Sequence, residues 1–222
     1  MAVSWMDLLV NPNRFFQQAL GDTEQLKMPG LIVLAAAICG AVAGYFAGSL
    51  SARMLDTAMG GMGSIILIVA VIAAFAMTFV VWVVWAAVFY LIGKAFKGTG
   101  SFNRCLEVAG YGYLPQVIGA VITVILAFEY LPKVAVPALT SAALTNPEQI
   151  QAATLALTTD PAMVQFAQLS GIVSMIFLLW SANCWIFGIR QVQKVSLRNA
   201  AITVGIPVIL FVIFQLYKLA GM

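Results

Sequence analysis

Five stretches of the chain carry no charged residue and are long enough to cross a lipid bilayer, which limits the fold more than any other feature. A helix needs about 20 apolar residues to cross a hydrocarbon core of about 30 Å. The five stretches lie between Lys27 and Arg53, Asp56 and Lys94, Glu107 and Glu129, Asp160 and Arg190, and Arg198 and Lys218. The sequence therefore predicts an all-α, polytopic membrane protein with five transmembrane helices.

The composition excludes several other classes of protein. Hydrophobic residues make up 63% of the 222 residues and charged residues 9%, whereas soluble domains contain about 25% charged residues. Disordered chains are polar and rich in charge. The net charge of +3 is small and scattered, whereas a nucleic-acid surface needs Lys and Arg clustered on one face. We therefore expect no nucleic-acid partner.

The residues that carry most enzyme chemistry are scarce. The chain has no histidine, which is the commonest general base and metal ligand. Its three cysteines, Cys39, Cys105 and Cys184, are far apart in the sequence, so neither a disulfide framework nor a thiolate metal site is indicated. We interpret them as small core residues, and expect no catalytic site, no metal and no cofactor.

The charged and turn-forming residues set the expected boundaries. We expect spans at about residues 29–51, 64–93, 108–131, 161–189 and 200–219. They belong to a membrane domain of residues 29–222, which follows a cytoplasmic segment of residues 1–28 and contains an external loop of residues 132–160. Asn146-Pro147 and Asp160-Pro161 are typical helix starts. A short helix from Pro147 to about Leu157 is therefore expected in this loop, with the fourth span after it.

The segment before the first span predicts two short amphipathic helices. Its apolar residues recur at helical spacing: Trp5, Leu8, Leu9, Phe15, Phe16 and Ala19. Asn11 and Pro12 supply an N-cap and a first-turn proline, so we place the break between the helices there. Helices that lie flat on the membrane interface, and helices that cap the cytoplasmic ends of the spans, are equal alternatives.

The distribution of Lys and Arg predicts the orientation in the membrane. The N-terminal segment and the loops on its side hold most of them: Arg14, Lys27, Lys94, Lys97, Arg104, Arg190, Lys194 and Arg198. The other side has Arg53, Lys133 and Lys218. Because cytoplasmic segments carry the excess of positive charge, we expect a cytoplasmic N-terminus and an external C-terminus in the cell (inner) membrane.

The first predicted span carries a stripe of small residues at intervals of four: Ala36, Gly40, Gly44 and Gly48. Such a stripe lets a second helix approach closely, and close contact stabilises helix pairs in lipid. The partner is either another span of the same chain or a second copy of this span. The second alternative makes the stripe a dimer seam in a homo-oligomer.

The third predicted span opens with Gly110-Tyr111-Gly112-Tyr113-Leu114-Pro115. Pro115 has no N–H and crowds the carbonyl of Tyr111, so the helix bends at this turn. The freed carbonyl needs a partner in lipid, and the candidates are a tyrosine hydroxyl and Asn183. A static kink and a moving hinge built on Gly110, Tyr111, Gly112, Tyr113 and Pro115 are the alternatives.

Ionisable and amide groups at membrane depth are few. Glu107 and Glu129 lie near the two ends of the third span, each within reach of an interface. Asn183 lies inside the fourth span, where helix packing is favoured over a ligand site. Three tryptophans fall inside spans and are interpreted as core or lipid-facing residues: Trp82, Trp85 and Trp180.

Together with five spans and a cytoplasmic N-terminus, three segments resemble the Yip (Ypt-interacting protein) domain family of integral membrane proteins. They are Asn11-Pro12-Asn13-Arg14-Phe15-Phe16, the run from Gly110 to Pro115, and Trp185-Ile186-Phe187-Gly188-Ile189-Arg190-Gln191-Val192-Gln193-Lys194-Val195-Ser196 running towards Ala200. The resemblance covers nearly the whole chain.

The resemblance carries expectations about partners. Eukaryotic members of that family associate with Rab-type small GTPases and act in vesicle formation and in the organisation of the Golgi or endoplasmic reticulum, commonly as oligomers. They carry a long cytosolic N-terminal region with an Asp-Leu-Tyr-Gly-Pro signature, whereas fewer than 30 residues precede the first span here. The difference favours a prokaryotic-type member, so a small GTPase partner is implied only by analogy.

These observations lead to two hypotheses of function. The first is a non-enzymatic membrane scaffold that binds a protein partner or anionic lipid at its cytoplasmic face, which carries Lys94, Lys97, Arg104, Arg190, Lys194 and Arg198. Topology alone is an equal explanation of these charges. The alternative is a small transporter or channel that uses the third-span hinge, with Glu107, Glu129 and Asn183 as polar stations.

Overall fold

The computed structural model describes residues 5–21 and 23–220 of the chain. In this part, five helices are long and apolar enough to cross a membrane. They are α3 (Lys27–Leu55), α4 (Gly63–Ala95), α6 (Leu114–Tyr130), α8 (Pro161–Gln193) and α9 (Leu197–Ala220). No strand occurs among the described residues. The structure confirms an all-α fold with five spans, and the chain is an integral membrane protein.

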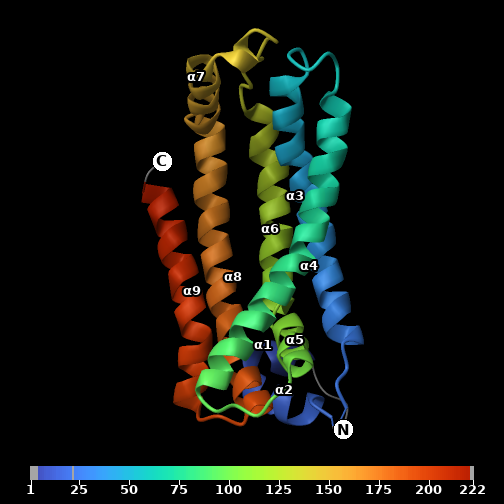
Figure 1. The fold of residues 1–222 in the computed structure, drawn as a ribbon, viewed down its shortest axis with the longest axis vertical. Helices are drawn as coiled ribbons and strands as arrows, with labels where there is room; N and C mark the ends of the chain where they lie inside the picture. The colour runs from blue at the N-terminus through green and yellow to red at the C-terminus, as the bar shows by residue number, and fades with distance from the viewer. Residues whose placement is uncertain (1–4, 22, 221–222) are drawn as a thin grey trace.

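The spanning helices form one elongated bundle with smaller helices at both ends (Figure 1). One end holds α1 (Trp5–Val10), α2 (Pro12–Ala19) and α5 (Phe102–Tyr111). The other end holds α7 (Pro147–Thr158), which follows the 3-10 helices η1 (Leu131–Lys133) and η2 (Ala143–Thr145) in the chain. The N-terminal helices and α7 therefore lie at opposite ends of the bundle.

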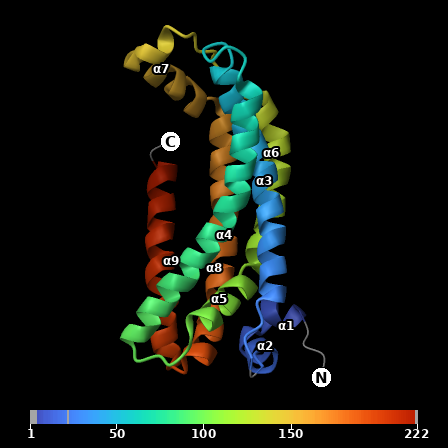
Figure 2. The same ribbon diagram turned by 45° about the vertical axis from the view of Figure 1, so that its right-hand side comes forward.

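Helix α4 runs obliquely across the bundle (Figure 2). Near the α7 end it packs along α3, and towards the opposite end it lies beside α5 and α9. The helix has 33 residues, which is about 50 Å at 1.5 Å per residue. Because this length exceeds the hydrocarbon core of a bilayer, tilting is the expected response.

Three helix starts use the caps that the sequence predicts. The side chain of Asn11 accepts a hydrogen bond from the backbone N–H of Arg14 at the start of α2. Asn146 caps α7 in the same manner through the N–H of Glu148, and Asp160 caps α8 through two N–H groups. The predictions of a break at Asn11 and of a short helix from Pro147 are confirmed.

The N-terminal helices cap the bundle through their apolar faces. Leu8 is fully buried, and Phe15 and Phe16 are 2% and 1% exposed. The indole N–H of Trp180 in α8 donates to the backbone oxygen of Leu9 at 2.9 Å. Of the two alternatives for this segment, these contacts favour the cap over helices that lie with this face in lipid. Trp5 stays 45% exposed.

The expected start of the third span at residue 108 is wrong. Helix α5 ends at Tyr111, and a separate helix α6 starts at Leu114. The N–H of Tyr113 bonds to the oxygen of Gly110 at 3.1 Å, which is one residue short of the α-helical pattern. The helix is therefore interrupted between Tyr111 and Leu114, and α5 lies in the layer of α1 and α2.

Candidate functional site

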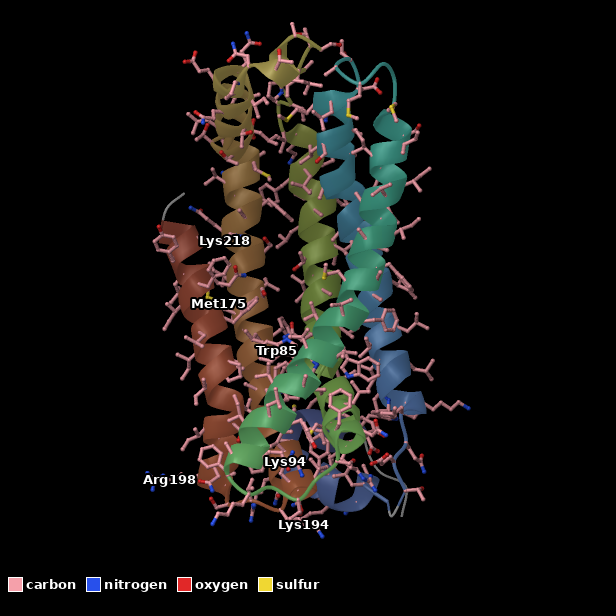
Figure 3. All side chains as sticks on the ribbon, viewed as in Figure 1. Trp85, Lys94, Met175, Lys194, Arg198 and Lys218 are labelled. Carbon is pink, nitrogen blue, oxygen red and sulfur yellow. The ribbon has the colours of Figure 1, made fainter. Side chains whose placement is uncertain are left out.

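Six basic residues from two segments of the chain, residues 94–104 and 190–198, gather at the end of the bundle that holds α1, α2 and α5. They lie at the end of α4, in the α4–α5 loop, in α5, at the end of α8, in the turn before α9 and at the start of α9: Lys94, Lys97, Arg104, Arg190, Lys194 and Arg198. Lys94, Lys194 and Arg198 mark this end in Figure 3. We call these six residues the basic end.

Most of these charges have no counter-ion in the protein. Within residues 5–21 and 23–220, Arg104 is the member of the basic end that forms an ion pair. Lys94 places its ammonium 5.2 Å from the centre of the Tyr90 ring. Lys94, Lys97, Lys194 and Arg198 are exposed, and Arg190 is half-buried. The basic end thus presents positive charge to its surroundings.

Gln193, the last residue of α8, holds the loop between α4 and α5 in place. Its side chain is fully buried, accepts a hydrogen bond from the N–H of Gly100 at 3.1 Å, and donates to the Cys105 sulfur at 3.1 Å. Its backbone oxygen accepts from the N–H of Thr99 at 3.0 Å. These bonds join the loop, α5 and α8 into one unit.

The loop can approach Gln193 because three glycines line its path. A Cβ atom at Gly98 would lie 2.3 Å from the Gln193 side-chain oxygen, and one at Gly93 would lie 3.0 Å from the same side chain. A Cβ at Gly100 would lie 2.5 Å from the backbone oxygen of Val192. Side chains at these positions would force the loop away from α8, because real Cβ atoms do not approach so closely.

Two lysines of the basic end occupy left-handed backbone conformations. Lys97 has φ of 59° and Lys194 has φ of 52°, values that few residues other than glycine adopt without cost. Lys194 terminates α8, and Lys97 lies in the turn after α4. The bonds around Gln193 therefore also fix the backbone from which these two side chains project.

A second group of polar residues joins α5 to the segment before α3. Arg104 donates to the Glu107 carboxylate at 2.9 Å and to the backbone oxygen of Gly21 at 2.6 Å. Burial raises the pKa of Glu107, while the bond and the charge of Arg104 oppose this shift. Glu24 accepts hydrogen bonds from Ser101 and Asn103, which lower its pKa.

The sequence places Glu107 at the end of the third span, but in the structure it lies in α5, before the spanning helix α6. It is 1% exposed and paired with Arg104 inside the layer formed by α5 and the N-terminal segment. Because α5 is separate from α6, Glu107 belongs to this end layer rather than to a spanning helix. Arg104 is correspondingly engaged in the fold, unlike the other members of the basic end.

Two tryptophan indoles hold the junction between α5 and α6. Trp185 in α8 donates to the backbone oxygen of Ala109 at 3.0 Å, and Trp82 in α4 donates to that of Leu106 at 2.9 Å. The oxygen of Ala109 lacks its regular helical donor because the N–H of Tyr113 bonds to Gly110 instead. These indoles bond to the carbonyls of Leu106 and Ala109 and not to that of Tyr111. A tyrosine hydroxyl or Asn183 as the partner of the Tyr111 carbonyl therefore stays a prediction.

The glycines of the junction leave room for these two indoles. A Cβ at Gly112 would lie 2.0 Å from the Trp185 nitrogen. A Cβ at Gly110 would lie 3.1 Å from the Trp82 nitrogen and 2.5 Å from Pro29. Tyr111, Tyr113 and Pro115 are all buried around them. The five residues predicted as a hinge thus lie together in a packed joint.

The three polar stations of the transporter hypothesis are not brought together. Glu107 is buried beside Arg104, Glu129 is exposed and pairs with Lys133 near the α7 end, and Asn183 is exposed on α8. They lie on different helices and at different heights of the bundle. The three groups therefore do not line one path through the bundle.

The stripe of glycines on α3 lies against α4 of the same chain. A Cβ at Gly44 would lie 2.6 Å from the Ala74 Cβ, and one at Gly48 would lie 2.7 Å from the Ala70 Cβ. Gly40 faces the Thr78 hydroxyl oxygen, 3.1 Å from where its Cβ would be. Ala36 continues the stripe and is 8% exposed. The face that could form a dimer seam is used inside the chain.

Sequence reasoning missed the residues that organise the basic end. Gln193 lies in a polar run, Arg190-Gln191-Val192-Gln193-Lys194, and nothing in that run distinguishes a buried glutamine from an exposed one. The spacing of Gly93, Gly98 and Gly100 was the available signal, because glycines around a short loop indicate close approach of another group. Trp185 carried no signal of its own beyond its apolar surroundings.

The site has little capacity for covalent chemistry. Burial raises the pKa of the Cys105 thiol to about 11, which keeps it protonated and a poor nucleophile. In the described part of the chain, no group of His, Cys, Asp and Glu is arranged to hold a metal ion. What the basic end offers among the described residues is exposed positive charge.

Comparisons with known proteins identify a family and one relative that are similar to this chain. A family model described as the Yip1 domain matches residues 6–218. An uncharacterized protein of the archaeon Methanocaldococcus jannaschii is 34% identical over 123 residues, which are 55% of this chain and 87% of that protein. No solved structure matches the chain. Because the family match runs from α1 to α9, the chain belongs to the Yip1 domain family of integral membrane proteins.

Proposed function

We propose that the protein is a non-enzymatic membrane scaffold whose basic end docks an acidic protein partner or anionic lipid in the cytoplasm. One observation carries the proposal: five of the six basic residues have no ion-pair partner among the described residues, although they share one end of the bundle. A basic residue near an anionic surface contributes about 1 kcal/mol of attraction. Five such residues are enough for measurable binding.

The preformed shape of the basic end supports this role. Gln193 and the glycines around it hold the loop that carries Lys97, and the same bonds fix the end of α8 before Lys194. A surface that is ordered before binding loses less conformational entropy when it binds. The family resemblance makes a small GTPase one candidate partner, by analogy with eukaryotic members.

The proposed orientation follows from the same charges. The protein lies in the cell (inner) membrane. Positive residues are retained on the cytoplasmic side of a membrane, so the basic end and the N-terminus face the cytoplasm and the C-terminus faces outward. Topology reporters attached to each end test this arrangement independently of binding. A reporter that places the C-terminus in the cytoplasm contradicts it.

The experiment neutralises two exposed members of the basic end, Lys94→Gln with Arg198→Gln, in the full chain. The matched control neutralises two cations near the α7 end, Arg53→Gln with Lys133→Gln. Each basic residue contributes about 1 kcal/mol, so loss of two weakens binding of an anionic surface about 30-fold. The control variant is expected to bind as the wild type does.

Two readouts separate protein from lipid. A photo-crosslinker in place of Lys97 traps cytoplasmic proteins in native membranes, and lipids retained in native nanodiscs report enrichment of phosphatidylglycerol. Loss of one crosslinked partner, or of phosphatidylglycerol, in the basic-end variant alone supports the proposal and identifies the ligand. Equal crosslinking and equal lipid content in both variants overturn it.

A further inference from the structure

A groove of about 520 Å³ runs along the spanning helices, between α8 and the pair α3 and α6, with the end of α9 beside it. Its lining residues recur at helical intervals on each helix, as Gln116, Gly119 and Thr123 do on α6. The groove therefore runs parallel to the helix axes. It lies within the spanning part of the bundle, apart from the basic end.

The floor of the groove is made of small residues. Gly40 of α3, Gly119 and Ala120 of α6, and Gly171 of α8 all line it. Along α8 the lining extends from Met163 to Phe177, which is about 20 Å at 1.5 Å per residue. One leaflet is half of a core of about 30 Å, so the groove is long enough for one acyl chain.

Polar side chains are placed along this otherwise apolar groove. Gln116 and Thr123 of α6, Ser174 of α8 and Gln215 of α9 line it, each half-buried. A polar group in hydrocarbon without a hydrogen-bond partner costs several kcal/mol. The ester and glycerol oxygens of a lipid are partners that an acyl chain alone does not supply.

A positive charge borders the groove near the end of α9. Lys218 lines the groove near the end of α9, with Gln215 one turn before it on the same face (Figure 3). Its ammonium lies 5.9 Å from the Phe214 ring centre, and no acidic side chain of residues 5–21 or 23–220 pairs with it. Glu129 pairs with Lys133, and Asp160 caps α8.

We propose that this groove binds one glycerophospholipid from the leaflet opposite the basic end. Lys218 binds the phosphate, Gln215 and the polar groups below it meet the glycerol and ester oxygens, and one acyl chain follows the floor of small residues. The site is independent of the basic end, which would face the other leaflet. A second copy of the chain is the competing occupant of the groove.

The test uses the full chain in nanodiscs with phosphatidylglycerol that carries a photoactivatable diazirine on one acyl chain. Crosslinked peptides are mapped by mass spectrometry. We expect labelling of the groove segment Met163–Phe177 well above labelling of the lipid-facing surface of α4. Labelling of the groove no higher than that of α4 overturns the proposal, and so does a crosslink from the groove to a second chain in place of lipid.

Two variants with matched controls complete the test. Lys218→Gln removes the proposed phosphate contact and is expected to lower groove labelling about fivefold, whereas Lys133→Gln near the same end does not. Ala120→Leu fills the groove and abolishes labelling, whereas Val121→Leu on the exposed face of α6 does not. Because Lys218 is exposed, Lys218→Gln is expected to leave the fold intact. Unchanged labelling in this variant therefore contradicts the proposal even where Ala120→Leu fails to fold.

Discussion

The indole nitrogen of Trp185 lies where a side chain at Gly112 would begin. A Cβ atom at Gly112 would be 2.0 Å from this nitrogen, and the same nitrogen donates to the backbone oxygen of Ala109 at 3.0 Å. The absence of a side chain at Gly112 thus allows the hydrogen bond that replaces the missing helical donor between α5 and α6. Through this contact α8 fixes the position of the layer that carries Arg104 and Glu107.

Gly112→Ala is expected to destabilise the protein by at least about 2 kcal/mol, as overpacking of a dense core does. The φ of Gly112 is −67°, which suits any residue, so the clash with Trp185 is the cause rather than backbone strain. The measurement is the thermal unfolding midpoint in detergent or nanodiscs.

Gly205→Ala is the matched control for this prediction. Gly205 lies inside α9, and a Cβ there meets nothing within 4 Å. The change is expected to be neutral or to stabilise the helix by up to about 1 kcal/mol. In a Trp185→Phe background the effect of Gly112→Ala should shrink, because the smaller ring removes the clashing nitrogen. Equal effects of Gly112→Ala in both backgrounds would contradict the proposed contact.

The spans and their caps could be predicted because they depend on local sequence. Long uncharged stretches follow from the thickness of the bilayer, and caps such as Asn11 and Asp160 act within three residues of the chain. The break between α5 and α6 could not be predicted in the same manner. Pro115 indicates a bend, but the donors that stabilise a complete break are Trp82 and Trp185, 24 and 76 residues away from their acceptors.

The charges of the candidate site could be predicted from the sequence, but the contacts that hold the site in shape could not. Positive residues on one side follow from the positive-inside rule, which needs no tertiary structure. Gln193 and Gly100 bond to each other across 93 residues of sequence, and the role of each depends on the presence of the other. The burial of Glu107 likewise follows from the position of α5, which is set by those distant contacts.

Glu107→Gln tests the buried ion pair through pH. Burial holds the pKa of Glu107 above its usual 4.5, so the folded protein binds a proton there more tightly than the unfolded chain does. The stability that this group contributes is present below pH 4.5 and is lost as pH rises through the pKa in the folded protein. The wild type should therefore lose stability relative to Glu107→Gln over this rise, as measured by unfolding midpoints from pH 4 to pH 8.

Glu24→Gln is the control, because the pKa of Glu24 is shifted in the opposite direction from that of Glu107. Hydrogen bonds from Ser101 and Asn103 hold the pKa of Glu24 below 4.5, so its contribution is present above pH 4.5 and is lost as pH falls through the pKa in the folded protein. The difference in stability between the wild type and Glu24→Gln should therefore change only below pH 4.5.

The opposite result for Glu107 would contradict its assigned shift. In that result the wild type gains stability relative to Glu107→Gln as pH rises from 4.5.

The bonds of Gln193 should protect Cys105 from alkylation. Cys105 is fully buried, and burial raises its thiol pKa to about 11. A soluble maleimide at pH 7.4 is expected to leave it unmodified in the wild type. Gln193→Ala removes the bonds to Gly100 and to the Cys105 sulfur, and loss of about 1.4 kcal/mol of local stability speeds modification about tenfold. Peptide mapping distinguishes Cys105 from the other two cysteines.

Gln191→Ala is the control for the thiol experiment. Gln191 lies two residues before Gln193 on α8, and its side-chain amide bonds to Asn13 at 3.4 Å rather than to the loop. Its substitution should leave Cys105 as protected as in the wild type. Equal rates in Gln193→Ala and Gln191→Ala would show that the loop is held by other contacts.

Gly44→Ala distinguishes packing within the chain from a dimer seam. A Cβ at Gly44 would lie 2.6 Å from the Cβ of Ala74 on α4, so the change is expected to separate the two helices and to destabilise the fold by about 1–3 kcal/mol. Gly30→Ala in the same helix meets nothing within 4 Å and is the control. Because the contact is made with Ala74, adding Ala74→Gly should restore most of the lost stability. A seam between two copies of α3 predicts a different result, in which Gly44→Ala lowers the crosslinked dimer fraction and Ala74→Gly restores nothing.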